Sequence, residues 1–174
     1  MSPAKPDGFL TDHLMEMTNM RFKSSSLLML AFAAVTASAQ TPAKSSAAPG
    51  LKWGPAPAVF PAGAQMAVLE GNPAGTGLFT VRLRFPDGYK VAPHVHPTDE
   101  NVTVISGTLR LGMGDKFDTK NLTALPTGGF VTAPANMAHF AVAQGETVVQ
   151  VHALGPFALT YINAADMPRA GGTK

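Results

Sequence analysis

After residue 50, apolar and polar residues alternate along several short stretches of the chain. From Phe79 to Phe85 every second residue is apolar, and threonine and arginine lie between them. This period of two is typical of a β-strand that buries one face. Pro86–Gly88 then supplies a turn signal. Because short stretches of this kind recur and no long amphipathic helix pattern appears, we predict one all-β domain, a sandwich or barrel, over residues 51–168.

Two hairpins are expected within this domain. Val102–Ile105 and Thr108–Met113 flank Ser106 and Gly107, which predict a tight turn between two strands. Thr147–His152 and Phe157–Ile162 flank a Gly-Pro pair and predict a second pair of strands. Antiparallel neighbours of this kind fit the sandwich or barrel.

The segment from Met20 to Gln40 has the pattern of a secretory signal peptide. Arg21 and Lys23 precede a largely apolar run, which ends in the small residues of Ala37–Ala39. We predict cleavage between Ala39 and Gln40 and a periplasmic or secreted protein. The apolar run is too short to cross a bilayer, so no stable membrane anchor is expected.

The rest of the N-terminal region fits this prediction only in part. Residues 1–39 are interpreted as a leader, but residues 1–19 carry acidic side chains that are unusual ahead of a signal peptide. Our hypothesis is that translation starts at Met20. Residues 40–50 are rich in Ser, Ala and Pro and predict a flexible linker, and residues 169–174 are assigned to a C-terminal tail.

Composition excludes several classes of function. The chain has 174 residues, a net charge of +2 and no cluster of Lys and Arg, so no nucleic-acid partner is expected. It has no cysteine, which excludes disulfides, thiolate nucleophiles and zinc–thiolate sites.

The five histidines include a pair two residues apart, His94 and His96. Alternate residues of a strand point to the same side, so both imidazoles can address one point. The turn signal Pro97–Asp99 can bring Glu100 back to that point, and His139 lies in a later strand region. Three imidazoles and a carboxylate suit Fe, Mn, Ni, Cu or Zn better than Mg or Ca. The alternatives are a polar strand end for the first three residues and a buried structural histidine for His139.

A family resemblance adds to this pattern. Gly88–Gly107 reads GYKVAPHVHPTDENVTVISG, in which the glycines, both histidines and Glu100 are similar in position to the first motif of the cupin superfamily. Gly129–Ala143 reads GFVTAPANMAHFAVA and resembles the second motif. Asn136 stands where that motif usually has glycine, and Ala143 where it often has asparagine.

The resemblance implies a double-stranded β-helix, or jelly-roll, cupin barrel that holds one divalent transition metal ion. It implies that the metal ligands are His94, His96, Glu100 and His139. Small single-domain exported bacterial cupins are the most similar type.

Function stays open among three readings. A metal with free positions can serve a dioxygenase or an isomerase/lyase acting on a small oxygenated molecule. The alternatives are a non-catalytic periplasmic barrel that binds a small molecule or metal, and a barrel whose metal only stabilises the fold. His152 is a candidate catalytic proton donor if it points inward, against a structural or rim role. The proline-rich stretch that contains Pro57 and Pro61 is interpreted as an N-terminal arm, and a homodimer through sheet edges or through this arm is also predicted.

Overall fold

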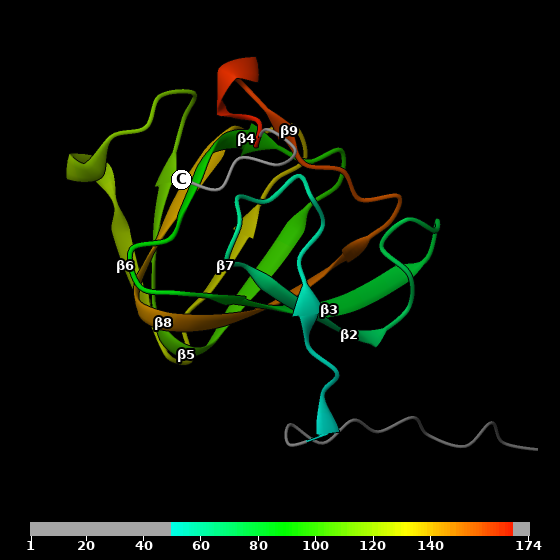
Figure 1. The fold of residues 1–174 in the computed structure, drawn as a ribbon. Helices are drawn as coiled ribbons and strands as arrows, with labels where there is room; N and C mark the ends of the chain where they lie inside the picture. Colours follow the sequence, from blue (N-terminus) through cyan, green and yellow to red (C-terminus); the bar gives the residue numbers. More distant parts are fainter. Residues whose placement is uncertain (1–49, 169–174) are drawn as a thin grey trace, which may run out of the picture. The chain divides into compact units, whose positions relative to one another are not determined.

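The computed structural model describes residues 50–168, which form an all-β jelly roll (Figure 1). The predicted leader, nearly all of the predicted linker and the predicted C-terminal tail lie outside these residues. Within residues 50–168, no helix is long and apolar enough to span a membrane. The strands are β1 (Gly54–Pro55), β2 (Gln65–Glu70), β3 (Leu78–Phe85), β4 (Lys90–Val95), β5 (Glu100–Met113), β6 (Thr123–Pro126), β7 (Phe130–Ala133), β8 (His139–Leu154) and β9 (Thr160–Tyr161). Two single-turn 3-10 helices, η2 (Thr119–Asn121) and η3 (Ala164–Asp166), accompany them.

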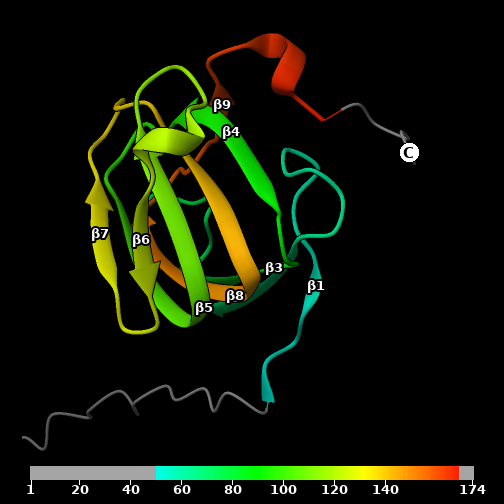
Figure 2. The ribbon, with the colours of Figure 1, turned by 90° about the vertical axis from the view of Figure 1, so that its left-hand side faces the viewer.

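The two longest strands, β5 and β8, pair antiparallel along their length and belong to both walls of the barrel. The first part of β8 pairs with β4 on its other edge, and β4 pairs with β9. The later part of β8 pairs instead with β3, which continues to β2 and β1. On the far edge of β5, β7 lies beside the first residues and β6 beside the later ones. Figure 2 shows the two walls curling around a common interior.

A corner in β5 and β8 lets them pass from one wall to the other. The register of the pair shifts on both sides of Ser106, and Gly107 has a φ of 77°. Thr147 is fully buried there, and its hydroxyl lies 3.1 Å from the carbonyl oxygens of Thr108 and Gly145. This hydroxyl supplies a donor where the strand-to-strand hydrogen bonding is interrupted. Strands commonly switch sheets through bulges and bends of this kind.

The alternation along β3 is confirmed. Phe79, Val81, Leu83 and Phe85 are buried, whereas the arginines and threonine between them face outward. On the outer face Arg82 donates to Gln150, and the guanidinium of Arg84 lies 4.1 Å from the centre of the Trp53 ring. The period of two therefore reports correctly which side of β3 meets the core.

Both predicted hairpins are wrong. Residues 100–113 form one strand that bends at Ser106 and Gly107, because β8 continues alongside both halves. In the second region Thr147–His152 does lie within a strand, β8, but of Phe157–Ile162 only Thr160 and Tyr161 form one. This strand, β9, pairs with β4 rather than with β8. A glycine beside a small polar residue marks a bend as well as a turn, and the sequence pattern does not distinguish the two.

The N-terminal arm, residues 56–61, is tied to the barrel by two tyrosine hydroxyls. Tyr89 donates to the carbonyl of Pro61 at 2.6 Å, and Tyr161 donates to that of Val59 at 2.9 Å. Phe60 of the arm packs near the ring of Phe85, with 6.4 Å between ring centroids. The arm therefore forms part of the wall next to the interior.

Replacing Gly107 by alanine tests the corner. A Cβ at this position would meet the carbonyl oxygen of Glu146 and lie 2.7 Å from the Thr147 hydroxyl. Gly145 has a similar φ of 70° but open space around it, so Gly145→Ala isolates the cost of the left-handed backbone, about 1–2 kcal/mol. We expect Gly107→Ala to lower the free energy of unfolding by a further 1–3 kcal/mol or so. Denaturant unfolding measures both, and equal losses would contradict the crowded corner.

Candidate metal centre

His94 lies near the end of β4 and His96 directly after it, and both side chains point to the same side, as their spacing predicts. His94 is 4% exposed and His96 is 3% exposed. His94 stands opposite His139 of β8 and Tyr161 of β9 in the sheet. The ring of Phe157 stacks on that of His96 at 4.2 Å. Both imidazoles are therefore buried inside the barrel, and Phe157 also fixes the plane of the His96 ring.

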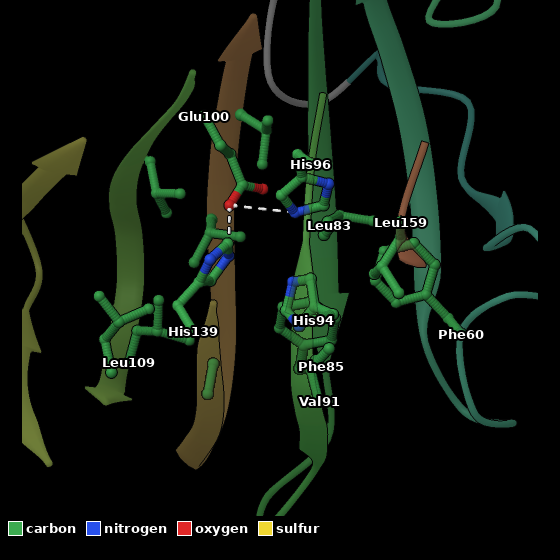
Figure 3. A pocket seen from close by; sticks show the side chains of 15 residues that line it. Phe60, Leu83, Phe85, Val91, His94, His96, Glu100, Leu109, His139 and Leu159 are labelled. Atoms are coloured by element: carbon green, nitrogen blue, oxygen red, sulfur yellow. Dashed lines mark ion pairs between the residues drawn. The ribbon is translucent and has the colours of Figure 1, made fainter. Parts of the chain in front are cut away.

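Glu100 and His139 are the first residues of β5 and β8. They lie at opposite ends of the β5–β8 ladder, since Glu100 pairs with Ala153 and His139 with Met113. Because the ladder curls around the interior, Oε2 of Glu100 nevertheless lies 3.2 Å from Nε2 of His139 and 3.6 Å from Nε2 of His96 (Figure 3). The structure thus brings together all four residues that the sequence singled out.

Hydrogen bonds join the turn after His96 to the turn before His139. The carboxylate of Asp99 accepts from the backbone N–H of Ala135 at 2.7 Å. The N–H of Asn136 donates to the carbonyl of His96 at 2.8 Å. Asn136 itself has a φ of 60°, which asparagine tolerates better than most residues and which explains its place in a glycine position. The two sequence motifs are therefore held at a defined distance.

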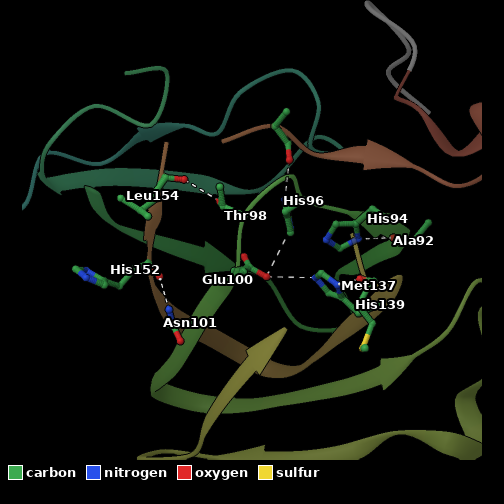
Figure 4. A network of polar contacts seen from close by, with 11 residues as sticks. Ala92, His94, His96, Thr98, Glu100, Asn101, Met137, His139, His152 and Leu154 are labelled. Atoms are coloured by element: carbon green, nitrogen blue, oxygen red, sulfur yellow. Dashed lines mark hydrogen bonds and ion pairs between the residues drawn. The ribbon is translucent and has the colours of Figure 1, made fainter. Parts of the chain in front are cut away.

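Each imidazole has one nitrogen bound to the backbone. Nδ1 of His94, His96 and His139 lies 2.7, 2.8 and 3.0 Å from the carbonyl oxygens of Ala92, Ala158 and Met137 (Figure 4). A carbonyl only accepts, so Nδ1 carries the proton in all three rings. In the neutral rings Nε2 then carries the lone pair, and it points into the cavity. These carbonyls were invisible to sequence reasoning, because any residue supplies one.

The inward nitrogens match the needs of a metal ion. The ligand atoms of His94, His96 and His139 all lie within 4.8 Å of one another. Nε2 of His96 and of His139 are buried, and the polar contact given for each is the carboxylate of Glu100, 3.6 and 3.2 Å away. Buried polar atoms are rarely left without a partner. Borderline nitrogen donors that converge in this way could hold a metal ion.

Burial and the charge of Glu100 shift the pKa values of the three histidines in different directions. Burial, together with the adjacent His139 and His96, lowers the pKa of His94 to about 3. Burial also lowers the pKa of His96. His139 is buried too, but its contact with the Glu100 carboxylate prevails and raises its pKa. For Glu100, burial opposes ionisation, but its contacts with His139 and His96 lower its pKa. Metal binding would compete with the proton on His139.

The four side chains border a small cavity of about 40 Å³ with otherwise apolar walls. Val91, Leu109 and Leu111 lie among the wall residues from the strands, and Phe60 and Leu159 complete it from outside the sheets. In Figure 3, Phe60 and Leu159 lie beyond His96, on the side away from Leu109. Among the residues that line this cavity, only the three histidines and Glu100 are ionisable.

The predicted catalytic role of His152 is not supported, because its side chain is exposed on the outside of β8. Its Nδ1 lies 2.8 Å from the Thr80 hydroxyl, and Figure 4 shows the ring directed away from Glu100. Val149, Val151 and Ala153 point inward instead. Val148, Gln150 and His152 share the other face of β8, and the alternation alone does not tell which of the two faces meets the core.

The link through Asp99 is testable by removing its carboxylate. We expect Asp99→Ala to lower the free energy of unfolding by about 1–2 kcal/mol, because the Ala135 N–H loses a charged acceptor. Asp99→Asn keeps an oxygen at the same place and should lose clearly less. Thermal or denaturant unfolding of the two variants distinguishes them, and an equal loss would show that the hydrogen bond is not what matters.

Comparison with known proteins supports the fold. The polyketide cyclase RemF from Streptomyces resistomycificus has a TM-score of 0.60 at 15% identity, covering 73% of this chain and 90% of that chain. A putative acetylacetone dioxygenase from Methylibium petroleiphilum PM1 has a TM-score of 0.57 at 21% identity, covering 76% and 90%. An RmlC-like cupin from Shewanella frigidimarina NCIMB 400 has a TM-score of 0.51 at 17% identity, covering 64% and 90%. No curated protein matches the sequence.

A family model described as a domain of unknown function, DUF4437, matches residues 69–155. This range is half of the chain and contains His94, His96, Glu100 and His139. The similarity to solved structures establishes the cupin jelly roll, and the chain belongs to the DUF4437 family.

Proposed function

We propose that this protein is a mononuclear metal-dependent enzyme, of the dioxygenase or isomerase/lyase type, that acts on a small oxygenated molecule. The observation that carries the proposal is the convergence of three histidine nitrogens within 4.8 Å beside a buried carboxylate. The metal is one divalent ion of Fe, Mn, Ni, Cu or Zn, the metals that mixed imidazole and carboxylate sites favour.

Each residue has a separate part in this proposal. His94, His96 and His139 hold the ion through Nε2, while Ala92, Ala158 and Met137 orient the rings by accepting from Nδ1. Glu100 is the fourth donor, and its negative charge offsets part of the charge of the ion. Such an ion supplies a Lewis acid with positions open to an oxygenated ligand, and a redox-active metal also supplies an electron-transfer centre. The apolar walls keep bulk water from the site.

A non-catalytic barrel that binds a small molecule or metal is the second candidate. If the three histidines and Glu100 all act as ligands, no ionisable side chain remains in the lining of the cavity to move a proton. A binding protein needs no such group, so this lining favours the second candidate over a reaction that requires a separate acid or base.

Location and assembly belong to the proposal as well. The signal-peptide pattern of residues 20–40 supports export to the periplasm or beyond. In the part of the chain that the structure describes, β6 and β7 each pair with β5 alone, which leaves one edge of each for a second copy. A homodimer would cover such an edge.

Metal content tests the centre, and the exposed histidine provides the control. We expect the full chain to retain about one equivalent of a transition metal, measured by elemental mass spectrometry after purification and reconstitution. His139→Ala should lose most of it, because a buried ligand nitrogen disappears, whereas His152→Ala should keep it. A folded wild-type protein that holds no metal after reconstitution would overturn the proposal.

Turnover separates the enzyme from the binding protein. We expect a metal-reconstituted sample to transform at least one member of a panel of diketones, hydroxy acids and catechols, followed by oxygen uptake and NMR. The activity should disappear in His139→Ala and persist in His152→Ala, because of these two residues His139 faces the proposed metal site and His152 does not. Stoichiometric metal with no reaction across the panel would favour the non-catalytic barrel.

A further inference from the structure

A second cavity adjoins the histidine site. Its volume is about 320 Å³, at the small end of the range for ligand pockets. β2 and β3 form one side, and the N-terminal arm and residues 157–159 form another. The cavity is therefore built largely from the segments that the two tyrosine hydroxyls and the β9 pairing hold in place.

Glu100 is shared between this cavity and the histidine cavity. Phe60, Leu83, Val151 and Leu159 also line both spaces. Oε2 of Glu100 points to His96 and His139, so the carboxylate stands where the polar centre meets the apolar space. A molecule in the larger cavity would therefore have one end beside the candidate metal centre.

The lining of the larger cavity is apolar apart from this one carboxylate. Its wall residues include Met66, Phe79, Val81, Val151, Phe157 and Leu159. Within the part of the chain that the structure describes, no lysine, arginine or histidine lines it, and no side-chain amide or hydroxyl does. A sugar or another polyhydroxylated ligand would leave its hydroxyls without partners there. A hydrocarbon chain or ring would instead gain from leaving water.

We propose that the cavity lined by Met66, Phe79, Val81 and Phe157 binds the uncharged apolar body of the ligand, whose oxygen-bearing end passes Glu100 to the histidine site. The ligand class is a short aliphatic chain or a single ring with one chelating or hydroxylic end. This inference rests on the proposed function for the polar end only. The apolar selectivity follows from the lining itself.

Met66 is a residue that sets the capacity of the cavity. It lies on β2, is half-buried and packs against the buried hydrophobic core, to which Val81 and Leu83 belong. Val68, on the same strand, is 50% exposed and does not line the cavity. Tryptophan at Met66 would occupy cavity volume, whereas tryptophan at Val68 would add a ring on the surface. The pair gives matched variants of one strand.

Chelating probes with different tails test the proposal on the full chain loaded with Zn²⁺. Acetohydroxamate carries the chelating head alone, hexanohydroxamate adds an apolar tail, and gluconohydroxamate adds a tail of the same carbon number with hydroxyls. Hexanohydroxamate has four additional methylenes, and each buried methylene contributes roughly fourfold. We therefore expect titration calorimetry to show it binding about 250-fold tighter than acetohydroxamate. Gluconohydroxamate should bind no tighter than acetohydroxamate.

The variants assign the effect to the cavity. Met66→Trp should remove the advantage of the hexanoyl tail and leave acetohydroxamate binding unchanged, and Val68→Trp should change neither. Val59 lines the same cavity from the arm. If Met66→Trp is too unstable to measure, Val59→Trp should show the same loss of the tail effect. A wild-type protein that binds acetohydroxamate but gains nothing from the hexanoyl tail would overturn the proposal.

A metal-free measurement separates this inference from the proposed function. Hexan-1-ol added to the metal-free full chain should shift the methyl resonance of Met66 and leave that of the exposed Met137 unchanged. If acetohydroxamate fails to bind but this shift occurs, the metal centre is wrong and the apolar cavity stands. If neither the shift nor the tail effect occurs, the cavity does not bind an apolar ligand.

Discussion

The long antiparallel pair of β5 and β8 is the constraint on which the rest of the structure depends. The pair runs through both walls, and its bend at Gly107 and Thr147 turns one ladder into a closed interior. Glu100 and His139 start at opposite ends of this ladder and meet because it curls. β3, β4, β6 and β7 each pair with one of these two strands. β2 and β9 pair with β3 and β4, and β1 pairs with β2. The geometry of the candidate metal centre is thus a consequence of backbone pairing and of one crowded corner.

Backbone groups also prepare the histidines chemically. Three carbonyl oxygens take the Nδ1 protons and leave Nε2 to face the cavity, and burial keeps His94 and His96 neutral. Neutral imidazoles are the form that a metal binds. Glu100 and His139 instead stabilise each other in their charged forms when no metal takes part. The protein therefore maintains a polar centre within walls that are otherwise apolar. Burying polar groups there costs little free energy because the Nδ1 protons are bound to carbonyl oxygens and the charges of Glu100 and His139 face each other.

Glu100 separates a polar part of the interior from an apolar part. On one side lie the imidazoles, and on the other lies a space bounded by aliphatic and aromatic side chains. The arm and the segment around Phe157 serve both sides, since Phe157 stacks on His96 and also lines the apolar space. The segment around Phe157 therefore fixes the orientation of His96 and bounds the apolar space at the same time.

The sequence by itself determined the all-β class and the inward face of β3, because period-two alternation is a local property. The spacing of His94 and His96 is also local, whereas Glu100 and His139 were added to them by the resemblance to the two cupin motifs. The sequence did not determine that residues 100–113 are one strand, because a bend and a hairpin turn have the same local residues and only the pairing with β8 separates them. It also left the orientation of His152 open, and the register of β8 with β3 placed that side chain on the outer face beside Thr80. The carbonyl partners of the imidazoles and the apolar cavity behind Glu100 were decided only by the tertiary structure, since both arise from segments distant in sequence that have no distinctive composition of their own.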